Sequence, residues 1–302
     1  MTETQLPAAP GVGLRLGPTR IATTGQLVRG YLNSTGDQGF AAHAASIKLA
    51  TGLDIVPPTM LDRDVGAKLV AGTYRGGYAL HAAQTFRFHR PLERDANYSI
   101  EGEIVDVFEK NEIGYFTAEA SCLSEAGEAA FTSSYTRAYL FPGNRNPDRQ
   151  ATRPKPSLSA YLDLHGADAA AVFPAVGSML EGTPRQLTRG LMNLYSGPGS
   201  NVHTDIGIAR RAGNADTIVQ GLMATSMECE LYREVFGAAW YSGGEIFVSF
   251  IRPILADSVL TAVGMVVDNA DGRIELRTAV FDQHQLLVTV GTAGCTLGDW
   301  ST

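Results

Sequence analysis

The sequence has few of the features that mark secreted, metal-stabilised or membrane-spanning proteins. Its three cysteines, Cys122, Cys229 and Cys295, lie far apart and form no CxxC pair. Such scattered cysteines suit reduced thiols in a cytoplasmic protein, and no spacing suggests a metal cluster or a cysteine nucleophile. No run of about 18 apolar residues occurs, so no membrane-spanning segment is expected. The cytoplasm is the predicted location.

Positive charge is also scarce. Lys and Arg total 24 against 31 Asp and Glu, which gives a net charge of −7. Binding of nucleic acid needs a clustered basic face, so a nucleic-acid partner is not expected. Residues 1–20 contain no apolar stretch of the kind a signal peptide needs, and we expect them to form a flexible N-terminal arm.

What the sequence does contain is an internal repeat. FHRPLERD at 88–95 and FIRPILAD at 250–257 share Phe, Arg, Pro and Asp at identical spacing. The chain has 302 residues, a length that suits two domains of about 150 residues each. The repeat indicates that one structural unit occurs twice. The agreement continues at the same offset in three further pairs: Gly102 and Gly264, Val105 and Val267, Asp106 and Asp268.

Each half ends in a series of predicted strands. After each Arg-Pro, the segments YSIEGEIVDVF and VLTAVGMVVDN alternate or run apolar, and more segments rich in Val, Thr, Tyr and Phe follow between short turns. Four prolines in FPGNRNPDRQATRPKPS mark a linker between the halves. The predicted organisation is a degenerate first unit over 21–141, a linker over 142–160 and a second unit over 161–302.

A buried helix is predicted just before the second series of strands, in TIVQGLMATSMECELYREVFGAAW. Its apolar residues recur at helical spacing and few polar residues interrupt them, so the helix must be covered on most sides. A helix enclosed by a curled antiparallel sheet is the hot-dog fold. The predicted fold is therefore α+β, a double hot dog of two tandem units, a type of unit that often dimerises.

The most unusual loop is YSGPGSNVHTD, from Tyr195 to Asp205, which is followed by the short predicted helix IGIARRAG. The order of YSGxxxNVHTD, ARRAG, IVQG, WxxGG and FIRP resembles the MaoC-like, or hydratase-2-like, enoyl-thioester hydratases and dehydratases. The resemblance covers most of the chain, and its specific motifs lie in the second half. It implies a double hot-dog fold and action on the thioester of CoA or of an acyl carrier protein.

In that family the loop reads Ser-Gly-Asp-x-Asn-Pro-x-His, and its Asp and His act on a water molecule and on the substrate α-carbon. Ser196, Gly197 and His203 match this pattern. The aspartate position is Pro198, the asparagine position is Ser200 and the proline position is Asn201. Because proline cannot exchange a proton, one of the two family acid–base groups is missing, and such a group is typically worth about 10²–10⁴-fold in rate.

The remaining parts still suit thioester chemistry. Adding or removing water next to a thioester builds negative charge on the carbonyl oxygen, and the resemblance assigns the N–H of Gly221, at the start of the buried helix, to that charge. His203 is the expected proton-transfer group, with Ser200, Asn201 or a bound water partly filling the aspartate's place. No metal, nucleotide or redox cofactor is required. Further candidate substrate-binding residues are Tyr195, Asn201, Gln220, Arg210 and Arg211.

Each candidate also has a simpler interpretation. His203 could be a loop histidine that bonds the backbone, Gly221 could serve close helix packing, Tyr195 could pack in the core, and Arg210 and Arg211 could be solvated arginines at a helix end. Three acidic residues are weaker candidates. Asp205 is favoured as the cap of the following helix, Asp37 as a turn or cap residue belonging to a different site, and a buried Glu228 would need a partner.

Three functions fit these observations. The first is hydration of a 2-enoyl thioester or dehydration of its 3-hydroxy partner. The second is a repurposed hydratase that keeps one base and catalyses an isomerisation or a cyclisation in a specialised pathway. The third is a non-catalytic thioester-binding subunit that pairs with a related hot-dog chain or with a second copy of itself.

Overall fold

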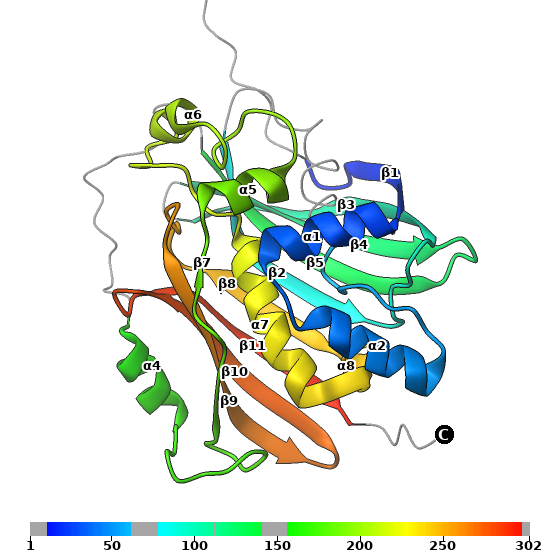
Figure 1. The fold of residues 1–302 in the computed structure, drawn as a ribbon. Helices are drawn as coiled ribbons and strands as arrows, with labels where there is room; N and C mark the ends of the chain where they lie inside the picture. The colour runs from blue at the N-terminus through cyan, green and yellow to red at the C-terminus, as the bar shows by residue number, and fades with distance from the viewer. Residues whose placement is uncertain (1–10, 62–77, 111–112, 141–155, 298–302) are drawn as a thin grey trace, which may run out of the picture.

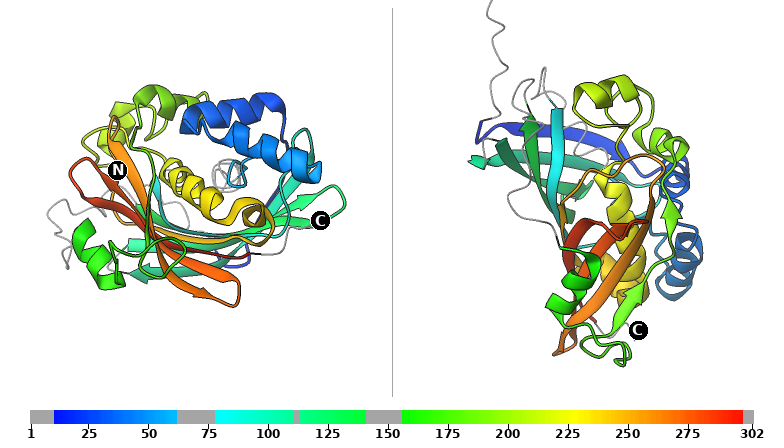
Figure 2. Two further views of the ribbon diagram at one scale, coloured as in Figure 1. Left: turned by 60° about the horizontal axis from the view of Figure 1, so that its bottom comes forward. Right: turned by 90° about the vertical axis from the view of Figure 1, so that its left-hand side faces the viewer.

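The protein is described by a computed structural model that covers residues 11–61, 78–110, 113–140 and 156–297. Within these residues, eleven strands form one antiparallel sheet, in the order β1-β3-β4-β5-β2-β8-β11-β10-β9-β6, with β7 paired to β9. The sheet curves around α7, and α1 and α2 lie on the same side of it, whereas α4 lies on the other side (Figures 1 and 2). We call the side that faces α7 the inner face and the opposite side the outer face.

The first half supplies five strands and the second half six. The first-half strands are β1 (Arg15–Ala22), β2 (Tyr78–Phe88), β3 (Asn97–Lys110), β4 (Ile113–Ser124) and β5 (Ala129–Leu140). The second-half strands are β6 (Met179–Glu181), β7 (Arg185–Gln186), β8 (Glu245–Phe250), β9 (Val259–Ala270), β10 (Arg273–Asp282) and β11 (Leu287–Thr296). The two halves meet where β2 pairs with β8, so the predicted meanders are confirmed and join into a single double hot-dog sheet.

The helices gather mainly on the inner face. They are α1 (Gly25–Thr35), α2 (Phe40–Thr51), α4 (Leu158–His165), α5 (Arg189–Ser196), α6 (Ile206–Arg211), α7 (Gly221–Phe236) and α8 (Trp240–Gly243), with the 3-10 turn η2 (Gly237–Ala239). Helix α7 is the predicted buried helix. Most of its residues are buried, because it has no polar face and the sheet, α1 and α8 enclose it.

The internal repeat has a direct structural counterpart. The two FxRP segments end the neighbouring strands β2 and β8, and each is followed by an aspartate with a positive backbone φ, 56° at Asp95 and 64° at Asp257. Aspartate tolerates this left-handed conformation better than most residues. The same turn therefore follows the same strand in both halves.

A glycine of the WxxGG motif is explained by packing. A Cβ atom at Gly244 would lie only 2.3 Å from the indole ring of Trp240, which is fully buried. The chain can pass over the indole ring only because residue 244 has no side chain. The indole in turn stacks on Phe236 with ring centroids 5.4 Å apart, so the motif joins the end of α7 to the start of β8.

Two predicted boundaries were wrong. The flexible arm was expected to extend to residue 20, but β1 begins at Arg15, because this segment pairs with β3 as an edge strand. The linker was expected to extend to residue 160, but α4 begins at Leu158, where the Ser157 side chain accepts a hydrogen bond from the Ala160 N–H. The rest of the predicted linker, up to residue 155, and residues 1–10 of the arm lie outside the described residues.

A buried ion pair joins the two halves on the inner face. Arg233, in the last turn of α7, donates from Nη1 to Asp37 Oδ2 at 2.6 Å and from Nη2 to Asp37 Oδ1 at 3.1 Å. Their side chains are only 8% and 9% exposed. Asp37 also accepts a hydrogen bond from the Phe40 N–H at the start of α2. Asp37 was expected to be a turn or cap residue, and its bond to the Phe40 N–H fits the turn, because the cap residue of α2 is Gly39. The ion pair fastens the loop between α1 and α2 to α7.

Candidate functional site

The predicted loop is held by its own short hydrogen bonds. Helix α5 ends at Gly197, whose φ of 70° turns the chain into the loop. Asn201 Oδ1 accepts a hydrogen bond from the His203 N–H at 2.8 Å, and Thr204 Oγ1 donates to the Gly199 carbonyl at 3.0 Å. Asp205 Oδ1 accepts from the Ile208 N–H at 3.0 Å, which confirms Asp205 as the cap of α6. These contacts fix the backbone on both sides of the histidine.

The His203 ring is oriented by a backbone carbonyl. Its Nδ1 lies 2.7 Å from the Ile218 carbonyl oxygen, and the Ile218 N–H donates to the Val202 carbonyl at 3.2 Å. A carbonyl oxygen only accepts, so Nδ1 carries the proton and donates it. Nε2 is then left with a lone pair, which is the state that a general base requires.

Burial keeps this imidazole neutral. It lowers the pKa of His203 to about 4, and the nearby charge of Arg137 lowers it further, while the hydrogen bond to the Ile218 carbonyl opposes both effects. The ring is therefore uncharged throughout the physiological pH range. A neutral imidazole with a free Nε2 can take a proton without first losing one.

Gly221 is the first residue of α7, three positions after Ile218. The N–H of a first helical residue has no acceptor within its own helix, which makes it available to a ligand. A Cβ atom at Gly221 would lie 2.6 Å from the Phe250 ring, so only glycine fits. This contact is the close packing that was the simpler interpretation of Gly221, and the oxyanion role stays a prediction.

Two residues of the first half that the sequence did not assign to the site, His81 and Arg137, lie beside Phe250 and His203. The His81 ring on β2 lies 4.5 Å from the Phe250 ring, and His81 pairs in register with Arg137 on β5. Burial, and next the charge of Arg137, lower the pKa of His81 to about 3. The charge of Arg137 thus acts on both imidazoles. No local pattern around His81 or Arg137 signals this, because the strand pairing that brings them here joins distant segments.

Tyr195 and Gln220 hold the site's framework together. Tyr195 is buried and its ring lies 6.0 Å from that of Tyr31, which agrees with the packing interpretation. Gln220 Nε2 donates to the Met192 carbonyl at 3.0 Å and to Ser196 Oγ. These bonds tie the end of α5 to the residue that precedes α7. The amide N–H groups of Gln220 therefore bond within the protein, whereas the sequence analysis predicted that Gln220 binds substrate.

The other predicted loop residues face solvent. Pro198, Ser200 and Asn201 are exposed, and Asn201 uses its Oδ1 on the backbone of His203. Arg210 and Arg211 are exposed in the last turn of α6, as expected of solvated arginines at a helix end. A carboxylate is absent from the loop at the family's aspartate position, and the geometry offers no direct replacement in Ser200.

Asp37 cannot supply the missing acid. Its partner Arg233 lies twelve residues beyond Gly221 on α7, which corresponds to roughly 18 Å at about 1.5 Å per residue. The prediction that Asp37 belongs to a different location from His203 agrees with this geometry. Glu230, also on α7, forms an ion pair with Arg185 at 2.6 Å.

Glu228 is the most unusual carboxyl group of α7. It is fully buried, and its Oε1 accepts a hydrogen bond from Thr278 Oγ1 at 3.1 Å, whereas Oε2 has no hydrogen-bond partner among the described residues. Burial raises the pKa of Glu228 to about 8, against the weaker effects of the Thr278 and Thr289 hydroxyl groups, which lower it. The sequence analysis expected a buried Glu228 to need a partner, and the Thr278 hydroxyl is that partner. With the raised pKa, the carboxyl group is protonated at neutral pH.

Replacing Glu228 with glutamine is expected to stabilise the protein at neutral and alkaline pH. Between the unfolded pKa near 4.5 and the folded pKa near 8, the folded state holds a proton that the unfolded state has lost, so stability falls as pH rises. Because the glutamine amide does not titrate, the substitution removes this dependence of the unfolding free energy on pH. The gain should be small at pH 5 and reach about 2–3 kcal/mol at pH 7, measured by urea unfolding across this range.

Glu234→Gln is the matched control, because Glu234 lies on the same helix but is exposed. Its stability difference from the wild type should stay within about 0.5 kcal/mol and change little with pH. A Glu228→Gln gain that is the same at pH 5 and pH 8 would contradict a protonated buried carboxyl.

Within the described residues, no group of three or more His, Cys, Asp or Glu side chains is placed to hold a metal ion. Over the same part of the chain, none of the helices combines the length and the apolar character needed to cross a membrane.

The architecture defines the class of the protein as a double hot-dog fold. One solved structure of that fold is a conserved protein from Mycobacterium tuberculosis, which this chain matches with a TM-score of 0.65 at 14% identity over 96% of that chain and 95% of its own. At 14% identity, this match shows that the two proteins share a fold.

Solved dehydratases share the same fold. A structure described as a MaoC-like dehydratase matches with a TM-score of 0.74 at 16% identity, over 96% of this chain and 98% of that one. The full-length peroxisomal multifunctional enzyme type 2 from Drosophila melanogaster matches with a TM-score of 0.65 at 16% identity. That match covers 93% of this chain but only 48% of the fly enzyme. No family model and no curated protein sequence matches the chain.

Proposed function

We propose that this chain is a member of the MaoC-like group that hydrates 2-enoyl thioesters, or dehydrates their 3-hydroxy partners, on CoA or on an acyl carrier protein in the cytoplasm. The observation that carries the proposal is the hydrogen bond from His203 Nδ1 to the Ile218 carbonyl at 2.7 Å. It leaves Nε2 basic and holds the ring at Ile218, three residues before Gly221, the first residue of α7. The shared fold of solved MaoC-like dehydratases supports the same activity.

In the proposed reaction His203 Nε2 takes a proton from water as the oxygen adds to the β-carbon of the enoyl group, and it then gives this proton to the α-carbon to complete the 3-hydroxyacyl product. The negative charge that develops on the thioester oxygen is stabilised by the Gly221 N–H and by the positive end of α7. In dehydration, Nε2 takes the α-proton and passes it to the β-hydroxyl, which leaves as water. The acyl chain follows α7.

Incubation with crotonyl-CoA and longer 2-enoyl-CoAs tests this proposal directly. Loss of the enoyl absorbance is expected, together with formation of the 3-hydroxyacyl product. The absence of turnover with every enoyl-CoA tested would contradict the proposal.

Replacing Pro198 with aspartate provides a gain-of-function test. The substitution places a carboxylate at the position where the resembled family carries its acid, on an exposed loop whose backbone is fixed by Asn201 and Thr204. Hydration should rise by at least about tenfold, because a positioned acid–base group contributes 10²–10⁴-fold and the new side chain will not be ideally placed. Pro198→Asn is the matched control, since it removes the proline but cannot transfer a proton. An equal effect of both would indicate that the backbone, and not the carboxylate, matters.

A second candidate function is binding of an acyl thioester without turnover. The observation that favours it is that the loop carries Pro198, and not a carboxylate, at the position where the resembled family has its aspartate, while the loop's own Asp205 is used to cap α6. The same one-base site would suit a repurposed hydratase that isomerises or cyclises its substrate. Tight binding of an enoyl-CoA with no consumption of it separates the binding function from both enzymatic ones.

A further inference from the structure

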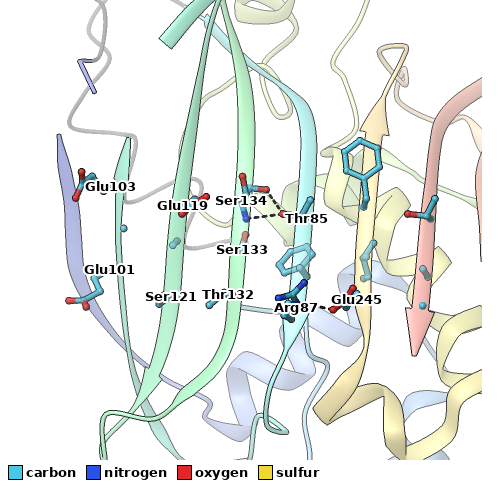
Figure 3. A pocket seen from close by; sticks show the side chains of 18 of the residues that line it. Thr85, Arg87, Glu101, Glu103, Glu119, Ser121, Thr132, Ser133, Ser134 and Glu245 are labelled. Atoms are coloured by element: carbon cyan, nitrogen blue, oxygen red, sulfur yellow. Dashed lines mark hydrogen bonds and ion pairs between the residues drawn. The ribbon is translucent and has the colours of Figure 1, made fainter. Parts of the chain in front are cut away.

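The side chains of β2 alternate between the two faces of the sheet. Thr85 and Arg87 point to the outer face, where they line an open hollow of about 900 Å³ (Figure 3). Gln84 and Phe86, which alternate with them, are buried on the inner face, the side of α7. If this alternation continued unbroken toward the start of the strand, His81 would point to the outer face with Thr85 and Arg87.

A β-bulge reverses the orientation of His81. Ala83 pairs with Thr136 on β5, whereas His81, two residues earlier on β2, pairs with Arg137, which is only one residue later on β5. Strand β2 therefore carries one extra residue at this point. Paired residues of neighbouring strands point to the same face, and Arg137 lies two residues after Tyr135, which is buried on the inner face. His81 consequently points to the inner face, and bulges commonly re-aim a side chain in this way beside active sites.

One aromatic side chain connects the His81 ring to the start of α7. The centroid of the His81 ring lies 4.5 Å from that of the Phe250 ring. The Phe250 ring in turn lies so close to Gly221 that a Cβ atom there would be 2.6 Å from it. His203 approaches the same helix end from its loop, where its Nδ1 lies 2.7 Å from the Ile218 carbonyl oxygen. An imidazole from each half of the chain is therefore placed near the first turn of α7.

His81 has a buried nitrogen that can accept a hydrogen bond. Its Nε2 has no hydrogen-bond partner among the described residues. Burial and then the charge of Arg137 lower the pKa of His81, and hydrogen bonds with the Gln84 side chain and the Ala83 backbone oppose them. A hydrogen bond raises the pKa of an imidazole when the ring donates it. Since Nε2 has no partner, Nδ1 is the donor, and Nε2 keeps a lone pair.

The polar groups of the loop itself are used elsewhere. Asp205 Oδ1 caps α6, and Asn201 Oδ1 accepts a hydrogen bond from the His203 N–H. Pro198, at the position where the resembled family has its aspartate, has no polar side chain. The place of the aspartate is thus left to a group from outside the loop, and β2 brings His81 to the same end of α7.

We propose that His81 Nε2 binds the attacking water and so takes the place of the missing aspartate as the second group that holds this water; the inference rests on the proposed hydration. One proton of the water passes to His203 Nε2 as the oxygen bonds to the β-carbon. The other proton stays on the oxygen and is donated as a hydrogen bond to His81 Nε2. His81 itself neither gains nor loses a proton. In dehydration the β-hydroxyl donates the same hydrogen bond before it leaves as water.

Replacing His81 with phenylalanine tests the contact with water, because phenylalanine keeps a ring against Phe250 but has no nitrogen. The kcat for crotonyl-CoA hydration should fall about 30- to 100-fold, while the dissociation constant of a saturated acyl-CoA changes less than about twofold. His81→Gln should stay within about fivefold of the wild-type kcat, because glutamine can place an oxygen acceptor close to the position of Nε2. His89→Phe is the matched control, since His89 is exposed just beyond the end of β2, and it should keep the wild-type kcat.

Restoring the family's aspartate in the His81→Phe variant provides a cross-test. The gain in kcat from Pro198→Asp should be at least about fivefold larger in this variant than in the wild-type chain, because the new carboxylate then supplies the only acceptor for the water. Pro198→Ala is the control, since it removes the proline without adding an acceptor. A purely structural role of His81 would give the same gain from Pro198→Asp in both chains.

The outcomes separate this inference from the proposed function. A wild-type chain that hydrates no enoyl-CoA overturns both. An active wild type whose His81→Phe variant keeps its kcat, or equal gains from Pro198→Asp in both chains, overturns the role of His81 alone and leaves hydration standing. Circular dichroism and thermal midpoints confirm that each variant is folded, and His81→Leu, with a smaller apolar side chain, is a second variant with the same expected loss of kcat.

Discussion

Replacing His203 with glutamine is expected to lower kcat for enoyl-CoA hydration by about 10²–10⁴-fold, while the dissociation constant of a saturated acyl-CoA changes less than about twofold. Glutamine keeps an N–H that can donate to the Ile218 carbonyl, so the loop retains its position, but it has no basic nitrogen. Stopped assays with crotonyl-CoA measure the first quantity and calorimetry the second. His89→Gln is the control, because His89 is exposed and bonds only Thr132 among the described side chains.

The pH profile distinguishes this histidine from a solvent-exposed one. Activity requires the neutral ring, and burial lowers the pKa of His203 in the folded protein to about 4. kcat/KM should therefore stay level as pH falls from 8 to 5 and decline only as pH approaches 4. A decline centred near pH 6.5 would contradict a buried base. Folding must be followed in parallel, because His43, His81 and His203 are all neutral when folded and ionise more readily when unfolded, which lowers stability below pH 6.5.

Replacing Arg233 with methionine is expected to reduce the free energy of unfolding by about 3–5 kcal/mol. The substitution leaves the Asp37 carboxylate buried without its bidentate partner, and the loop between α1 and α2 loses its attachment to α7. Urea denaturation followed by circular dichroism measures the change. Thermal unfolding should show a matching fall in the midpoint temperature.

The double variant Asp37→Leu/Arg233→Met should recover most of this loss, because removing both charges leaves no uncompensated charge in the core. Arg94→Met is the matched control. Arg94 pairs with Asp54 at 3.3 Å, but these side chains are 31% and 38% exposed, so the loss should stay below about 1 kcal/mol. Equal losses of unfolding free energy for Arg94→Met and Arg233→Met would show that burying the Asp37–Arg233 pair does not make its loss more costly.

Local and repetitive features of the fold could be predicted from the sequence. The helical spacing of apolar residues predicted α7, and Asp205 was correctly placed as the cap of α6. The duplicated FxRP segment predicted two equivalent units. The end of the N-terminal arm was misplaced, because whether Arg15 to Arg20 join the sheet depends on the free edge of β3, which local composition does not encode.

The candidate site was predictable only in part. The loop motif located His203 and Gly221, since the spacing of the motif lies within one stretch of chain. The Ile218 carbonyl, which decides the tautomer of His203, and the Phe250 ring, which covers Gly221, were not predictable. Ser200 was proposed as a partial substitute for the acid but faces solvent. The direction of a short loop side chain depends on contacts that no local pattern records.

The sequence alone determined the strands, the buried helix, the duplication and the identity of the candidate base, because periodicity, capping and repetition act between residues close along the chain. The tertiary structure decided which strands meet at the centre of the sheet. Through that pairing it brought the charge of Arg137 close enough to act on His203 and set the His81 ring against Phe250. The packing of the helices on the inner face joined Asp37 to Arg233. The contacts of Arg137 and His81 follow from the register between distant strands, and that register follows from the packing of the whole sheet.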